Sequence, residues 1–317
     1  MAHSQLFLHN QTAIRLYEEV AKKAPIMDYH NHLDVKALYE DQVFESITDV
    51  WLKHDHYKWR LMRYAGVDES LITGGGDPKT KFLTWVKVIE QAVGNPIHLW
   101  CRQELQTFFG VTMDLTSENG EAIYEACNAI IKEQALTPSK LLERVNVALL
   151  CTTDDPCDDL IYHQGIREQR GYSFKVLPSF RPDQAIAIHK TTFPAYIKRL
   201  EEVTDRKLDS VDDVIQALTK RLDFFMTEGC VITDHSIERF GDRLITLAEA
   251  DSLYKRRLQG ETLAIEEAAR YSHYMLYRMG LIYGERGVTM QWHIGALRNT
   301  NGNAFAKLGL DAGYDIM

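Results

Sequence analysis

Short apolar runs separated by helical segments constrain the fold of this chain more than any other feature. The runs are nearly continuous in apolar character, which is typical of parallel strands that are covered on both faces. A strand–helix alternation of this kind predicts a parallel sheet with right-handed crossovers. The runs are Pro25–Asp28, Val145–Cys151, Phe174–Phe180, Cys230–Thr233 and Val288–Trp292. The sequence therefore predicts an α/β fold with five visible strand–helix units.

The helical segments carry their own start and stop signals. Ser210 followed by Asp213 indicates a helix start, because a hydroxyl can cap the first turn and an acidic side chain suits its positive end. An apolar stripe with the helical period follows, and Gly229 is placed to end it. A second long helix is predicted over residues 262–286, with Gly287 behind it.

Composition narrows the class of protein. The chain has 317 residues, a net charge of −9, 45% apolar and 26% charged residues, and no linker that would divide it, so we expect one domain with a large insertion near its start. The acidic balance disfavours nucleic-acid binding but allows an anionic small substrate. The start of the chain resembles no secretory signal, and no apolar stretch is long enough for a membrane span. Five cysteines without C-x-x-C spacing favour reduced thiols and a cytoplasmic location.

Polar residues cluster directly after the predicted strands. In (β/α)-barrels and in open parallel sheets, ligands bind at this carboxyl-terminal edge of the strands. The repeated coincidence predicts an enzyme site. The residues are Asp28, His30 and His32 after the first run, Thr152, Thr153, Asp154 and Asp155 after the second, Arg181 after the third, Asp234 and His235 after the fourth, and His293 and Arg298 after the fifth.

The pair His30-x-His32 is the first candidate metal site. Alternate residues of an extended segment point the same way, so two imidazoles can converge on one divalent cation such as zinc. The alternative is that one or both are ordinary surface or hydrogen-bonding histidines.

Each remaining candidate also has an alternative. His56 and Tyr57 could transfer protons, or belong to a solvated helix face. Arg181 could bind a substrate carboxylate, or pair with a neighbouring acidic residue. His293 could be a third ligand, a proton-transfer group or a buried hydrogen-bonded histidine. Of the aspartates after the second run, Asp154 or Asp155 is expected to cap the next helix, with a second metal carboxylate as the alternative.

At these residues the chain resembles uronate isomerase, a member of the amidohydrolase superfamily. The matching segments occur in family order and cover nearly the whole chain. They are residues 28–33 (DYHNHL), 55–60 (DHYKWR), 151–156 (CTTDDP) with 158–160 (DDL), 177–183 (LPSFRPD) and 293–299 (HIGALRN).

The resemblance implies a metal-dependent-hydrolase-like, distorted (β/α)8 TIM barrel with a helical insertion at residues 34–144, within a single domain over 1–317. It implies interconversion of D-glucuronate with D-fructuronate and of D-galacturonate with D-tagaturonate, with a divalent metal, zinc, as cofactor. A small-molecule hexuronate is the expected partner, with no nucleic acid and no membrane, and a homo-oligomer is left open. The implied site residues are His30 and His32 as metal ligands, His56, Tyr57 and His293 as catalytic residues, and Arg181 and Arg298 as substrate-binding residues.

One departure from the family pattern affects the expected fold. Members of the family run on beyond this length, through the last barrel strands and a Thr-Asp-Ser-Arg motif that supplies a metal ligand and a substrate contact. Met317 precedes any such motif, so we expect a partial barrel. The alternative functions are a metal-dependent amidohydrolase of the same superfamily, which would use a strand-end aspartate as base, and an inactive fragment or binding scaffold.

Overall fold

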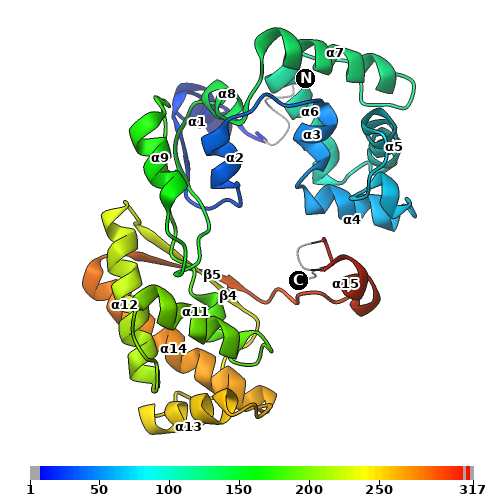
Figure 1. The fold of residues 1–317 in the computed structure, drawn as a ribbon. Helices are drawn as coiled ribbons and strands as arrows, with labels where there is room; N and C mark the ends of the chain where they lie inside the picture. The colour runs from blue at the N-terminus through cyan, green and yellow to red at the C-terminus, as the bar shows by residue number, and fades with distance from the viewer. Residues whose placement is uncertain (1–7, 310–311, 315–317) are drawn as a thin grey trace. The chain divides into compact units, whose positions relative to one another are not determined.

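The computed structural model describes residues 8–309 and 312–314, and these form mainly helices together with short strands (Figure 1). The chain divides into two compact units. Within the described residues, unit 1 comprises 8–27, 40–148, 298–309 and 312–314. Unit 2 comprises Asp28–Tyr39 and Leu149–Leu297.

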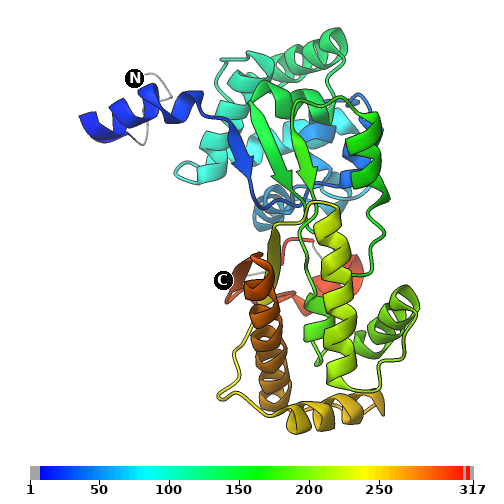
Figure 2. The same cartoon turned by 90° about the vertical axis from the view of Figure 1, so that its left-hand side faces the viewer.

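Every predicted apolar run overlaps a strand. One sheet has the order β1-β2-β3, and Figure 2 shows its three strands side by side. The second sheet is a parallel pair, β4 with β5, and β2 also runs parallel to β3. The strands are β1 (Ile26–Asp28), β2 (Val147–Cys151), β3 (Lys175–Leu177), β4 (Ile232–Ile237) and β5 (Thr289–Ile294). The predicted α/β class with parallel strands is confirmed.

Phe180 links the two sheets. Its N–H donates to the carbonyl of Ile232 at 3.2 Å, and its carbonyl accepts from the N–H of Asp234 at 3.0 Å. On its other side it forms a parallel bridge with Asp154. The chain after β3 is therefore extended and paired on both edges, which places the segment after β2 and the start of β4 on either side of one residue.

The predicted ends of the last two strands were wrong. We expected Asp234, His235 and His293 to follow their strands, but they lie inside β4 and β5. The reason is continuous pairing from Ile232↔Thr289 to Ile237↔Ile294, which carries both strands past the apolar residues. Pairing of the backbone, not the apolar character of the side chains, sets these boundaries.

Unit 1 is built from helices with well-defined starts. Asp77 and Asn95 accept hydrogen bonds from the N–H groups of Thr80 and Ile97, and proline follows each of them at the first helical position. The predicted insertion 34–144 contains α2 to α8. The helices are α1 (Gln11–Glu19), η2 (Ala21–Lys23), α2 (Val35–Glu40, which runs on from unit 2), α3 (Ile47–Leu52), α4 (His56–Tyr64), η3 (Glu69–Leu71), α5 (Pro78–Gln91), α6 (Pro96–Phe109), α7 (Gly120–Gln134), α8 (Pro138–Arg144) and α15 (Gly302–Leu308).

The helices of unit 2 pack beside the strands, and α14 contacts β5. The predicted start at Ser210 is confirmed, because its hydroxyl accepts from the N–H of Asp213, and Gly287 ends α14 in a left-handed conformation. Among the described helices none is both long and apolar enough to cross a membrane. The helices are α9 (Ile161–Gln169), α10 (Asp183–Ile186), α11 (Phe193–Thr204), α12 (Val211–Thr227), α13 (Leu247–Leu258) and α14 (Ile265–Arg286).

A buried polar group joins the ends of β2 and β3. The Asp154 carboxylate accepts from the hydroxyl of Thr152 at 2.8 Å and from the N–H of Ser179 at 3.2 Å. Nε2 of His163 lies 2.8 Å from the same hydroxyl. Burial raises the pKa of Asp154 to about 7 and lowers the pKa of His163 to about 4, because it disfavours the charged form of each group.

Replacing Phe180 should destabilise unit 2. Its ring is fully buried and meets the rings of Phe225 and Tyr283 edge-on. Phe180→Ala would leave a cavity, and we expect the free energy of unfolding to fall by about 3–5 kcal/mol in a denaturant titration. Phe240→Ala is the control, since Phe240 is 45% exposed, and should cost less than about 1 kcal/mol. Equal losses in the two variants would contradict the role of Phe180.

Asp154→Asn should change how stability depends on pH. Between pH 4 and 7 the folded wild type holds a proton on Asp154 that the unfolded chain has lost, so its stability falls as pH rises. His163 acts in the opposite direction between about pH 4 and 6.5, because it is neutral when folded. The variant lacks the effect of Asp154. The free energy of unfolding of the variant minus that of the wild type should therefore increase from pH 4 to pH 7. Asp209→Asn, at an exposed position, should give a flat difference.

Candidate functional site

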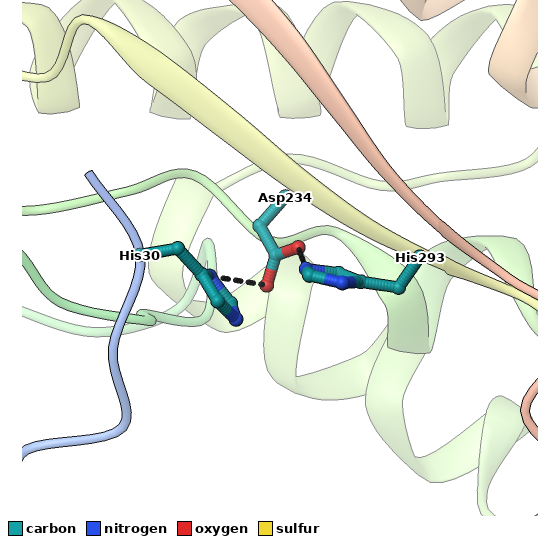
Figure 3. A group of neighbouring side chains, drawn as sticks. All are labelled: His30, Asp234 and His293. Carbon is teal, nitrogen blue, oxygen red and sulfur yellow. Dashed lines mark ion pairs between the residues drawn. The ribbon is translucent and has the colours of Figure 1, made fainter. Parts of the chain in front are cut away.

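Two histidines and one aspartate of unit 2 converge beside β1, β4 and β5. Nε2 of His293 lies 2.6 Å from Oδ1 of Asp234, and Nδ1 of His30 lies 3.8 Å from Oδ2. One donor atom from each residue lies within 4.8 Å of the other two. Figure 3 shows the carboxylate between the two imidazole rings, with Asp234 on β4, His293 on β5 and His30 on the segment after β1.

Sheet register explains why Asp234 and His293 meet. Ser236 is the partner of His293, so their side chains lie on the same face of the sheet. Asp234 is two residues before Ser236 and therefore shares that face, because strand side chains alternate. His30 is brought in by the end of β2, where Asn31 donates its N–H to the carbonyl of Cys151 and Thr153 donates its hydroxyl to the carbonyl of Asn31.

The donor set fits a divalent cation. Two imidazoles and one carboxylate are ligands that zinc and neighbouring metals accept. Nδ1 of His30 is buried and has no hydrogen-bond partner in the described part of the chain. Burial lowers the pKa of His30, and the nearby Asp234 opposes this in part. The ring is therefore neutral at pH 7, which is the form that binds metal.

Arg181 lies beside this centre. Its Nη1 is 3.2 Å from Oδ2 of Asp234, and its Nε donates to Oδ2 of Asp183 at 2.8 Å. Asp183 also accepts from the N–H of Ser236, so it connects the guanidinium to β4. The ion-pair alternative for Arg181 is thus present in the structure. The predicted contact of Arg181 with the substrate stays a prediction. The guanidinium lies beside the candidate cation ligands.

His32 lies near the centre but outside the group of three. Its ring centroid is 5.0 Å from that of His30, and the two rings stand edge to face. The predicted convergence of His30 and His32 depends on the alternation of side chains along a strand. β1 ends at Asp28, so this alternation does not extend to either histidine. Its role as a ligand stays a prediction.

Asp234 was not predicted as a ligand, although it directly follows an apolar run of the sequence. A carboxylate directly after such a run is the signal that could have found it, because an acidic side chain is rarely buried without a partner. The expectation that Asp154 or Asp155 caps the next helix was wrong. α9 begins at Ile161, whose N–H donates to the Asp159 carboxylate at 3.2 Å, and Asp155 instead accepts from the N–H of Cys157 in a turn.

The predicted proton-transfer residues lie on α4 in unit 1. Asp55 caps this helix by accepting from the N–H groups of Tyr57 and Lys58, and it also accepts from the buried Lys58 ammonium at 2.7 Å. The rings of His56 and Tyr57 are 4.4 Å apart, and Tyr57 is 56% exposed. The capped first turn thus presents both rings together. Arg298 belongs to the same unit, and the roles of all three stay predictions.

Comparison with known proteins identifies relatives of this chain. The glucuronate isomerase family profile matches residues 1–317. Uronate isomerases of Clostridium perfringens and Bacillus subtilis are 43% and 40% identical to it over 97% and 98% of the chain. The chain spans 66% of the length of these relatives.

Solved structures agree with the sequence comparison. The crystal structure of a uronate isomerase from Thermotoga maritima matches with a TM-score of 0.91 and 35% identity, over 97% of this chain and 67% of that one. A glucuronate isomerase from Caulobacter crescentus gives a TM-score of 0.88 and 27% identity, over 95% and 64%. The family profile over residues 1–317 and the relatives at 40–43% identity show that the chain belongs to the glucuronate isomerase family.

Proposed function

We propose that this chain carries out uronate isomerisation, converting D-glucuronate to D-fructuronate and D-galacturonate to D-tagaturonate. The observation that carries the proposal is the buried carboxylate of Asp234 between two imidazoles, with the Arg181 guanidinium beside it. A cationic group next to a cation-binding site suits a substrate that has both a carboxylate and hydroxyl oxygens. Membership in the family supports the same reaction.

We assign His30, Asp234 and His293 to a zinc ion, and His32 as a further ligand. The ion would supply electrostatic stabilisation to an oxyanion that develops on the substrate. His293 was predicted as a catalytic residue, and its contact with Asp234 supports a ligand role instead. The five cysteines are buried free thiols, which supports a reducing compartment such as the cytoplasm.

Proton transfer falls to the first turn of α4 in this proposal. The sugar ring opens with help from His56, and Tyr57 takes the proton from C2 so that a cis-enediol forms. A proton then returns at C1 to give the ketouronate. Arg181 and Arg298 hold the substrate, with Arg181 assigned to the C6 carboxylate. The capping of the turn by Asp55 supports this role, because acid–base catalysis needs groups in fixed positions.

Asp234→Asn should weaken cation binding. The amide keeps the shape of the side chain but removes the charge that two imidazoles share, so the affinity for Zn²⁺ should fall at least about tenfold in calorimetric titrations at pH 7. Asp209→Asn is the control and should bind like the wild type. Equal affinity in the Asp234 variant would show that the cation does not bind at this centre.

Tyr57→Phe should remove most turnover while leaving substrate binding. Loss of a general acid–base group typically lowers kcat by about 10²–10⁴-fold. Conversion of D-glucuronate by the chain can be followed with a coupled assay for the ketouronate. Tyr64→Phe, at an exposed position on the same helix, should keep full activity. Normal turnover in Tyr57→Phe would exclude Tyr57 as the base, and amide hydrolysis without isomerisation would favour the amidohydrolase alternative.

A further inference from the structure

A short segment near the end of the chain, Ala312–Tyr314, packs on α4 within unit 1. Arg60 donates from Nε to the carbonyl of Gly313 at 3.0 Å, and Arg63 donates to the carbonyl of Ala312. The Arg63 guanidinium also lies 5.1 Å from the centre of the Tyr314 ring. All three residues of the segment are buried. Two arginines of one helix therefore bind consecutive carbonyls of a segment about 250 positions away.

Gly313 approaches the backbone of His56 more closely than any other residue type could. A Cβ atom at this position would lie 2.6 Å from the carbonyl oxygen of His56, and the φ angle of +90° also favours glycine. That carbonyl belongs to the first residue of α4. The contact is with the main chain, so no side-chain rotation can relieve it.

The other side of the segment binds the chain next to Arg298. The carbonyl of Tyr314 accepts from the N–H of Thr300 at 3.3 Å and from its hydroxyl at 2.5 Å. Thr300 lies two residues after Arg298. The segment thus connects the helix that presents His56 and Tyr57 with the stretch that carries the predicted substrate-binding arginine.

We propose that Gly313 is a positioning residue that fixes the first turn of α4, and with it His56 and Tyr57, for proton transfer. This inference rests on the proposed function. The turn is held on one side by the Asp55–Lys58 pair and on the other by Gly313 and Arg60. Without the second contact the helix start can shift, and a displacement of about 1 Å is enough to cost about 10²-fold in rate.

The test compares Gly313→Ala with Gly309→Ala. Both glycines have positive φ angles, +90° and +80°, so alanine strains the backbone at both positions. A Cβ atom at Gly309 meets nothing within 4 Å, whereas at Gly313 it meets His56. Hydrogen exchange of the Tyr57 and Lys58 amides should rise at least about tenfold in Gly313→Ala and stay unchanged in Gly309→Ala. In the coupled assay, kcat should fall at least tenfold in Gly313→Ala alone, with KM within about twofold.

The outcomes separate this proposal from the proposed function. Unchanged exchange in Gly313→Ala would overturn the docking, and raised exchange with normal kcat would overturn the positioning role. Absence of turnover in the unsubstituted chain would overturn the proposed function. In that case the hydrogen exchange of the Tyr57 and Lys58 amides still decides whether Gly313 fixes the first turn of α4. If Gly313→Ala does not fold, Arg60→Met removes the bond to Gly313 and should raise exchange, and Arg60→Lys should restore part of the protection. No change in Arg60→Met would then overturn the proposal.

Discussion

The buried charge of Asp234 is the constraint on which the described site depends. Its side chain is only 1% exposed, and an isolated carboxylate in such a place would be strongly unfavourable. Arg181 after β3 supplies an opposite charge, and the imidazoles of His293 on β5 and His30 after β1 lie on either side of the carboxylate. The register of β4 against β5 places His293 beside Asp234, and the segments after β1 and β3 bring in the other two partners. The three side chains thus lie together because each of them contacts the buried carboxylate of Asp234.

Much of the fold was predictable from the sequence because its determinants are local. The apolar runs, the Ser210 cap and the Gly287 terminator each act within a few residues; each run overlaps a strand, and the cap and terminator appear as predicted. The ends of β4 and β5 were not predictable in this way, since pairing between two strands about 57 positions apart extends both of them through polar residues. Non-local hydrogen bonding overrode composition there.

The candidate site was only partly predictable for a similar reason. Strand-end position pointed to His30, His293 and Arg181, and the structure brings these three together. Asp234 went unassigned because its meeting with His293 depends on the register of β4 against β5, although its place directly after an apolar run was a local signal. The contact of Gly313 with His56 joins residues far apart in the chain, and the sequence offers only a glycine in a polar tail to indicate it.

The linkage through Phe180 has a consequence for how this sequence can vary. Only two residues, Pro178 and Ser179, separate β3 from the position that pairs with both Asp154 and Thr233. Because side chains alternate along an extended chain, adding or deleting one residue there would turn the Phe180 ring out of the core and bring a polar neighbour inside. This stretch can therefore accept changes of residue type far more readily than changes of length. A related chain with an insertion or deletion there would have to pair these strands differently.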